Sequence, residues 1–141
     1  VFVTLHVNLG TFAPVKEEQW RRGKLHEEFY EISPAAAAAL NRAKKVGRPI
    51  VAVGTTVVRT LESAARQGRI RAGSGATGLF IRPGYRFAFV DHLITNFHVP
   101  RSSLLMLVSA FVSRKKILEL YRTAIAKKFR FFSFGDGMLI T

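Results

Sequence analysis

The hydrophobic pattern of the chain is most informative on either side of Gly54. Residues 50–53 form a short apolar run rich in β-branched side chains, which is typical of a buried strand. After Gly54, apolar residues recur at helical spacing and predict a helix with one buried face, at Val57, Val58, Leu61, Ala64 and Ala65. We expect Thr55 or Thr56 to cap this helix and Gly68 to end it. The predicted unit is a strand, a tight turn and a helix.

The same pattern predicts further elements before and after this unit. Strands are expected at residues 1–7, 28–32, 79–81, 86–90 and 129–134. Helices are expected at residues 35–45, 104–112 and 114–128, with serine caps at Ser33, at Ser102 or Ser103, and at Ser113. The 104–112 helix is apolar on all sides and is expected to be fully buried. Because strands and helices alternate, we expect one α/β domain over residues 1–141, with mixed strands and helices in an incomplete barrel-like or open-sheet arrangement.

The segments between these elements are expected to be loops. Turns are predicted at residues 9–14 and 83–84, a polar surface excursion at 17–24, and a loop at 67–78. Residues 73–78 match the pattern G-x-G-x-x-G. We reject a dinucleotide site, because that fingerprint must follow a strand and open a helix, whereas here a strand-like segment follows. A flexible glycine-rich loop is expected instead.

Composition changes this picture mainly through charge. The chain has 141 residues, with 22 Lys and Arg against nine Asp and Glu, and a formal net charge of +13. Residues 42–86 contain ten Lys or Arg and one acidic residue, Glu62. Such a one-sided bias favours a polyanionic partner such as nucleic acid over a basic face that is merely solvated.

Several other classes of protein are excluded by what the sequence lacks. No apolar run is long enough to cross a membrane and no signal-peptide pattern opens the chain, so no membrane partner is expected. There are no cysteines, which excludes disulfides and cysteine metal sites. The histidines, at positions 6, 26, 92 and 98, have no metal-ligand spacing, so no metal is expected.

Candidate ligand-binding groups concentrate at the predicted turn formed by Gly54, Thr55 and Thr56. The turn joins the carboxyl end of a strand to the amino end of a helix, where free backbone N–H groups and the helix dipole attract ligands. Arg59 and Glu62 lie three residues apart on one face of the same helix. Either these groups bind a ligand, or the threonines only cap the helix and Arg59 pairs with Glu62. Spacing alone leaves both interpretations open.

Two further polar groups are candidates. His98 follows Thr95 and Asn96 just before a capped helix, and this cluster can bind an anion or a sugar or can anchor a loop. Asp136 lies between two glycines at a predicted strand end, where a carboxylate can act as a base or hold a turn. The aromatic residues near it are expected to be core rather than base-stacking platforms (Phe129, Phe131, Phe132 and Phe134).

Several stretches in order along the chain carry a family resemblance. They are residues 3–12 (VTLHVNLGTF), 52–63 (AVGTTVVRTLES), 83–87 (PGYRF), 91–98 (DHLITNFH) and 100–111 (PRSSLLMLVSAF), with 24–26 (KLH) and 132–139 (FSFGDGML) fitting as well. Together they resemble the S-adenosylmethionine:tRNA ribosyltransferase-isomerase family of queuosine biosynthesis. Small departures occur at Asn8, Ser103, Phe134 and Gly137, where the family has Gly, Thr, Tyr and Ala.

The resemblance implies a larger two-domain protein of which this chain is the C-terminal part, without the N-terminal part and a small β-domain. The lack of an initial Met and the strand-like start agree with a fragment. The implied reaction transfers the ribosyl part of S-adenosylmethionine to an aminomethyl-deazaguanine base at the tRNA wobble position. The ribosyl group is rearranged to an epoxycyclopentanediol, giving epoxyqueuosine-tRNA, while adenine and methionine leave. S-adenosylmethionine is then a consumed substrate, and no cofactor is expected.

With this resemblance, candidate roles can be assigned to named residues. A base must remove a proton next to the sulfonium, and Glu62, Asp136, His98 and also Asp91 are available. Expected substrate-binding residues are Gly54, Thr55, Thr56, Arg59, Tyr85, Thr95, Asn96, Arg101 and Ser102. Expected tRNA-binding residues are Arg69, Arg71 and Arg82. We expect a cytoplasmic monomer. The alternatives are a non-catalytic basic RNA-binding module and a phosphate-binding α/β enzyme that uses the Gly54 turn.

Overall fold

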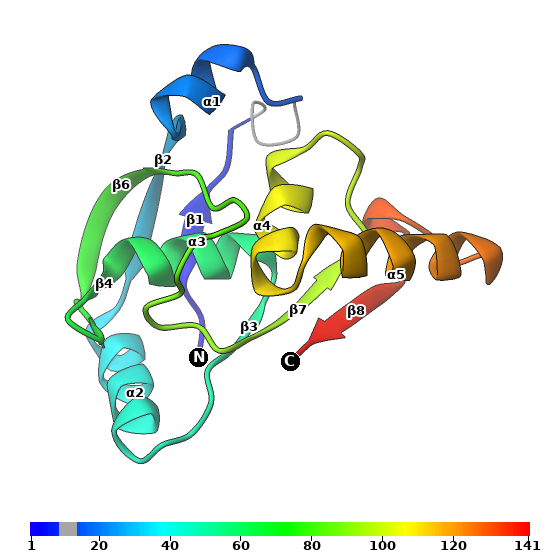
Figure 1. The fold of residues 1–141 in the computed structure, drawn as a ribbon. Coiled ribbons are helices and arrows are strands. Elements are labelled where there is room, and N and C mark those ends of the chain that lie inside the picture. The colour runs from blue at the N-terminus through cyan, green and yellow to red at the C-terminus, as the bar shows by residue number, and fades with distance from the viewer. Residues whose placement is uncertain (9–13) are drawn as a thin grey trace.

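The computed structural model describes residues 1–8 and 14–141. Over these residues the strands form two three-stranded sheets and one two-stranded hairpin. Helix α3 (Thr55–Ala64) crosses the middle of the molecule and packs against strands of both sheets and against α4 (Ser103–Phe111) (Figure 1). Neither sheet closes into a barrel within the described part of the chain. The prediction of a mixed α/β fold with open sheets is therefore confirmed.

The first sheet is antiparallel, with the order β1-β2-β6. Its strands are β1 (Thr4–His6), β2 (Lys24–Ile32) and β6 (Gly73–Leu79). Strands β1 and β2 confirm the strands predicted at residues 1–7 and 28–32. The prediction of a flexible glycine-rich loop at residues 73–78 is wrong, because this segment forms β6 and its glycines pair with β2. A Cβ atom at Gly75 would lie 2.7 Å from the ring of Tyr30, so a glycine here makes room for that ring. The G-x-G-x-x-G segment opens no helix, in line with the rejection of a dinucleotide site.

The second sheet is mixed, with the order β3-β7-β8. Strands β3 (Val51–Val53) and β7 (His92–Asn96) are parallel, and the connection between them contains α3. Strand β8 (Gly137–Ile140) pairs antiparallel with β7. The chain therefore builds this sheet from segments that are far apart in sequence.

Two of the predicted strands are wrong. Residues 86–90 form no strand, because the Glu62 carboxylate accepts the backbone N–H groups of residues 88–90 and so removes them from any strand pairing. Residues 129–134 contain a 3₁₀ turn, η2 (Phe132–Phe134), and the strand lies just beyond, in β8. The strand expected at 79–81 ends at Leu79, as the last residue of β6.

The ends of α3 also differ from prediction. Gly54 is the N-cap residue, with φ of 101°, and no side chain caps the helix, so the expected threonine cap is wrong. The helix ends at Ala64 rather than at Gly68. Gly68 instead forms the turn of a hairpin between β4 (Ala65–Arg66) and β5 (Arg69–Ile70), where a positive φ is required.

The remaining helices are α1 (Glu17–Arg22), α2 (Pro34–Lys45) and α5 (Arg114–Ala126). Three serine caps are confirmed by hydrogen bonds from the backbone N–H three residues on: Ser33 from Ala36, Ser102 from Leu105, and Ser113 from Lys116. Helix α1 lies in the segment that was predicted to be a polar surface excursion, at residues 17–24. It is polar, and its exposed Glu and Arg side chains pair at i,i+4.

The prediction that the 104–112 helix is fully buried holds for only part of α4. Leu104, Leu107 and Val108 are buried, whereas Leu105 and Met106 are half-buried and line an open hollow of about 460 Å³. The hollow lies between α4, α5 and Trp20 of α1. An apolar sequence therefore does not by itself fix how many sides of this helix are covered.

The second sheet is covered by helices on one face only. Ala52 and Leu93 point into the core and are almost fully buried. Val53, Ile94 and Leu139 are neighbours across the three strands and point the other way, with 66%, 40% and 62% of their surface exposed. The strand predicted as buried is thus buried on one face, and the other is an apolar outer face.

No helix among the described residues is long and apolar enough to cross a membrane. The turn expected at residues 9–14 lies outside the described residues except for Pro14, which forms a bridge with Ser102.

Candidate active site

The strand ends of the second sheet bring several of the predicted site residues to one edge. Because β3 and β7 are parallel, the residues that follow them lie at the same edge of the sheet. Strand β8 begins there, since its Gly137 pairs with Asn96. The N–H of Gly54 donates to the carbonyl oxygen of Ile94 at 2.8 Å and ties the turn to this edge. We call this the carboxyl edge, made of residues 54–56, 95–98 and 135–137.

Helix α3 presents free backbone donors at the carboxyl edge. The first intrahelical bond runs from the Val58 N–H to the Gly54 carbonyl at 3.3 Å. The N–H groups of Thr55 and Thr56 precede it and have no acceptor within the helix. Among the residues that the structure describes, no side chain caps them. The start of α3 therefore offers positively polarised donors and two hydroxyls to an electron-rich ligand.

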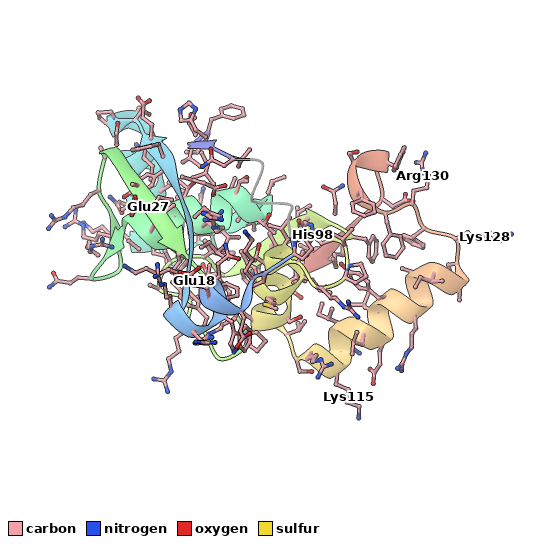
Figure 2. All side chains as sticks on the ribbon, turned by 90° about the horizontal axis from the view of Figure 1, so that it is seen from above. Glu18, Glu27, His98, Lys115, Lys128 and Arg130 are labelled. Atoms are coloured by element: carbon pink, nitrogen blue, oxygen red, sulfur yellow. The ribbon has the colours of Figure 1, made fainter. Side chains whose placement is uncertain are left out.

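His98 is held by two neighbours at the carboxyl edge. Its Nε2 atom lies 2.9 Å from Oγ1 of Thr95, and its backbone N–H donates to the Tyr121 hydroxyl at 2.7 Å. Burial lowers the pKa of the His98 imidazole to about 4, so the ring is neutral at pH 7. Figure 2 shows His98 among the ribbons rather than at the outer surface. A neutral imidazole here can accept a proton or a hydrogen bond.

Thr95 and Asn96 point to opposite faces of the second sheet. Successive strand residues alternate, and Thr95 is buried under the helices whereas Asn96 is exposed on the outer face. Both were predicted to bind substrate. Only a ligand that wraps around the edge of the sheet would contact the two side chains together.

Asp136 holds a tight turn at the start of β8. One of its carboxylate oxygens accepts the backbone N–H of Arg130 at 2.5 Å and lies 3.5 Å from Nε of the same residue. Gly135 has φ of 113°, which favours glycine, and a Cβ atom at Gly137 would lie 3.0 Å from the Thr95 carbonyl. The Asp136 side chain remains 32% exposed. It serves the turn, and a role as base stays a prediction.

Glu62 lies two helical turns from the carboxyl edge, near the end of α3. Both of its oxygens are used: Oε1 accepts from Phe89 and Val90, and Oε2 accepts from Ala88 and from the Tyr85 hydroxyl at 3.1 Å. Burial, and then the charge of Glu62, raise the pKa of Tyr85 far above its usual value. Glu62 therefore anchors the segment that contains Tyr85.

Arg59 faces the first sheet and does not pair with Glu62. Its Nη1 forms a buried ion pair with Glu28 of β2, and its Nε donates to the Leu79 carbonyl at 3.3 Å. Both charged side chains are at most 3% exposed. Removing one partner of such a pair leaves an uncompensated buried charge, which is strongly destabilising. The pairing of Arg59 with Glu62, one of the two readings of their spacing, is thus not the one found.

The other predicted groups are dispersed. Asp91 accepts hydrogen bonds from Lys44 Nζ at 2.8 Å and from the Ile50 N–H at 2.7 Å. Burial raises the pKa of Asp91, but these bonds outweigh it and hold the pKa below its usual value. The buried hydroxyl of Ser102 caps α4, and the exposed Arg101 beside it lines the 460 Å³ hollow.

The three predicted tRNA-binding arginines lie away from the carboxyl edge. Arg69 belongs to strand β5 of the β4-β5 hairpin and Arg71 follows that strand, beyond the far end of α3. Both side chains are exposed. Arg82 stacks its guanidinium over the ring of Trp20, with 4.9 Å to the ring centre, and donates to the Trp20 carbonyl. Arg82 thus has a local packing role, and tRNA contact by all three stays a prediction.

Sequence reasoning missed two partners of the site. Tyr121 lies in the predicted 114–128 helix and was given no role there, yet its hydroxyl fixes the backbone of His98. Glu28 was read as a strand residue, yet it is the ion-pair partner of Arg59. Neither has a local sequence signal, because both partners are more than 20 residues away.

The core role expected for the phenylalanines near Asp136 is largely wrong. Phe131 packs against Phe97 and Tyr121, with ring centres 5.1 and 5.5 Å apart. Phe129, Phe132 and Phe134 are 41%, 47% and 70% exposed. Across the described residues, no three His, Asp or Glu side chains gather in a group that could hold a metal ion.

Comparison with known proteins identifies the family. A family model described as "Queuosine biosynthesis protein" matches residues 1–140. The S-adenosylmethionine:tRNA ribosyltransferase-isomerase of Moorella thermoacetica is 60% identical over 139 residues, covering 98% of this chain and 41% of the relative. The protein of the same name from Carboxydothermus hydrogenoformans is 57% identical over 138 residues, with the same coverage of 98% and 41%.

A solved structure agrees with these sequence matches. The crystal structure of the S-adenosylmethionine tRNA ribosyltransferase from Thermotoga maritima superimposes with a TM-score of 0.76 and 50% identity, covering 81% of this chain and 40% of that one. The chain therefore spans about two fifths of the length of the proteins it matches. Because the family model covers nearly the whole chain, the chain belongs to the queuosine biosynthesis protein family.

Proposed function

We propose that this chain contributes the carboxyl-edge site of an S-adenosylmethionine:tRNA ribosyltransferase-isomerase. In the proposed reaction the ribosyl group of S-adenosylmethionine is transferred to the aminomethyl-deazaguanine wobble base of tRNA and rearranged to the epoxycyclopentanediol of epoxyqueuosine. Adenine and methionine leave. The observation that carries the proposal is 60% identity to a relative of that name over 98% of the chain, which includes every candidate site residue.

We place the small-molecule site at the carboxyl edge rather than around Glu62. The free N–H groups and hydroxyls at the start of α3 lie at this edge with His98 and Asp136, and they can bind the polar ribosyl and adenine groups. Both oxygens of Glu62 are already occupied by four donors. A base needs a free lone pair aimed at the substrate proton, so His98 or Asp136 is the better candidate.

The neutral state of His98 suits such a role in part. An imidazole with a pKa of about 4 is unprotonated at pH 7, but its low basicity gives little driving force for proton removal. Asp136 is an acceptor with a partly exposed carboxylate. In the proposed reaction Asp136 accepts the proton, and His98 forms hydrogen bonds that position the ribosyl hydroxyls. The partner is tRNA in the cytoplasm, and the protein acts as a monomer.

The test uses the chain within a polypeptide of the relatives' full length, for example in place of the matching part of the Moorella thermoacetica relative. We call this the family-length protein. Asp136→Asn and His98→Gln should each lower the turnover of ribosyl transfer from S-adenosylmethionine to substrate tRNA, the first by roughly a hundredfold or more. Matched substitutions at Asp91, which is tied to Lys44 and Ile50, should change stability rather than turnover. Normal turnover in both Asp136→Asn and His98→Gln would show that neither residue is the base. A family-length protein that binds tRNA but transfers nothing would favour the non-catalytic alternative.

A further inference from the structure

Helix α5 and the residues after it form a basic surface beside the proposed site, to which only Arg130 is joined, through Asp136. Residues 114–130 include seven Lys or Arg and one acidic residue, Glu119. All seven cations are exposed (Arg114, Lys115, Lys116, Arg122, Lys127, Lys128 and Arg130). Figure 2 shows Lys115 near one end of α5, with Lys128 and Arg130 toward the other, all pointing away from the body of the molecule. We call these seven cations the α5 surface.

The charges of the α5 surface are almost uncompensated. Within the described residues, the only ion pair among the seven cations joins Arg130 to Asp136. Helix α1 differs, because Arg21 and Arg22 each pair with a glutamate of the same helix. Like charges on neighbouring helical positions repel each other and destabilise the helix. An anionic partner would remove that repulsion.

Exposed aromatic rings adjoin the α5 surface. Phe129, Phe132 and Phe134 follow α5 and are between 41% and 70% exposed, although burying such rings would stabilise the fold. Phe131, in the same segment, turns inward and packs on Phe97. Phe131 is half-buried and Phe129 also packs against Phe97, so Phe132 and Phe134 are the rings of this segment most open to a partner.

The backbone holds this aromatic segment in a defined shape beside the carboxyl edge. The Phe132 N–H donates to the Phe97 carbonyl at 2.9 Å, and Asp136 accepts the Arg130 N–H. Phe132 has φ of 61°, an uncommon backbone state for a bulky residue that persists only when its surroundings enforce it. Because Phe97 precedes His98, the exposed rings lie next to the proposed site.

We propose that the α5 surface and the exposed rings of Phe132 and Phe134 bind the single-stranded loop of the tRNA substrate. The inference rests on the proposed function and locates its nucleic-acid contact. The cations contact phosphates along α5, which is 13 residues or about 20 Å long. The rings stack on unpaired bases beside the base that enters the carboxyl edge, since anticodon-loop bases can be splayed out and stacked on aromatic side chains.

An anionic membrane is the competing partner for a basic helix with apolar neighbours. A helix that lies on a membrane needs a free apolar face opposite its cations. On α5 much of that face is buried in the protein, at Ile117, Tyr121 and Ala124, and of its large apolar side chains only Leu118 and Ile125 are exposed. Exposed rings on a turn beside a polar site suit base stacking better than insertion into lipid.

The test compares matched variants of the family-length protein. Lys115→Gln with Arg122→Gln removes two charges seven residues apart, on one face of α5. Arg21→Gln with Arg22→Gln removes the same charge from α1 and serves as control. Phe134→Leu removes the ring but keeps an apolar side chain. Melting curves check that each variant is folded, and binding of substrate tRNA is measured over a range of salt concentrations.

The α5 pair should flatten the slope of log affinity against log salt by roughly one to two units, with no change for the α1 pair. Phe134→Leu should weaken tRNA binding roughly 5- to 100-fold with the salt slope unchanged. Equal slopes for both charge pairs, or unchanged affinity for Phe134→Leu, would overturn the proposal. So would loss of binding to phosphatidylserine vesicles in the α5 pair while tRNA binding is kept.

The proposed function can fail without the inference failing. If the parent protein transfers no ribosyl group but its tRNA binding depends on Lys115, Arg122 and Phe134 as above, the nucleic-acid surface is supported and the activity is not. If transfer occurs, the α5 pair should raise KM for tRNA at little cost to kcat. A fall in kcat with KM unchanged would contradict a binding role for the α5 surface.

Discussion

Replacing Glu62 by glutamine should mainly destabilise the segment at residues 85–90. The carboxylate accepts four hydrogen bonds, from Tyr85 and from the backbone N–H groups of Ala88, Phe89 and Val90, at 2.8 to 3.1 Å. Glutamine has one oxygen and one NH₂ group in the same space. If its oxygen serves Phe89 and Val90, its NH₂ faces the Ala88 N–H, donor against donor.

The magnitude follows from these bonds. Two charge-assisted bonds become neutral, at a loss of about 1 kcal/mol each, and the Ala88 N–H loses its acceptor at about 1 kcal/mol or more. The Tyr85 hydroxyl can rotate and accept from the new NH₂, so it adds little. Glu62→Gln should therefore lower the free energy of unfolding by about 3 kcal/mol. Tyr85→Phe, which removes one donor at 3.1 Å, should cost about 1 kcal/mol.

Urea unfolding of the family-length protein measures both values. With a slope near 2 kcal/mol per molar urea, Glu62→Gln should lower the midpoint by about 1.5 M and Tyr85→Phe by about 0.5 M. Steady-state kinetics on the folded fraction then separate anchoring from catalysis. An unchanged midpoint together with a turnover reduced about a hundredfold would refute the anchoring argument and restore Glu62 as a base.

Four further predictions follow from other parts of the structure. Thr56→Val should change the free energy of unfolding by no more than about 0.5 kcal/mol, because Thr56 forms no cap, yet should lower kcat/KM in ribosyl transfer; unchanged kinetics would make the turn purely structural. Burial lowers the pKa of His98 from 6.5 to about 4, so the unfolded chain binds more protons than the folded one between these two pH values. The free energy of unfolding should therefore be at its full value above pH 6.5 and should fall toward pH 4 by at most about 1.4 kcal/mol per pH unit. Melting curves of His98→Gln over the same pH range should lack this part of the acid sensitivity. Neutralising Arg69 and Arg71 together should flatten the salt slope of tRNA binding by roughly one to two units, and an unchanged slope would exclude phosphate contacts there. The chain on its own should be inactive in ribosyl transfer and should self-associate in sedimentation experiments through the apolar outer face of the second sheet; a fully active monomer would contradict this.

Local chemistry in the sequence was sufficient for the elements whose causes are local. Serine caps at Ser33 and Ser113 were predictable, because a cap needs only a hydroxyl and a backbone N–H three residues on. The strand, turn and helix around Gly54 were predictable for a similar reason, since the change of hydrophobic period and the glycine lie within a few residues of one another.

Elements set by distant partners were not predictable in this way. The glycines of β6 form a strand only because β2 lies beside them and Tyr30 fills the space above Gly75. Residues 86–90 have strand-forming side chains, yet Glu62 takes their backbone donors from more than 20 residues away. In both cases a tertiary contact overrides local propensity.

The candidate site divides along the same line. The sequence by itself determined which polar residues are available, and through its motifs it determined the family, because residue identity is independent of folding. Only the tertiary structure decided which residues meet: parallel pairing of β3 and β7 brings Gly54 to the edge that carries His98, while the length of α3 keeps Glu62 two turns away. The structure also turned Arg59 toward Glu28 and left Phe132 and Phe134 exposed, since burial depends on what the rest of the chain covers.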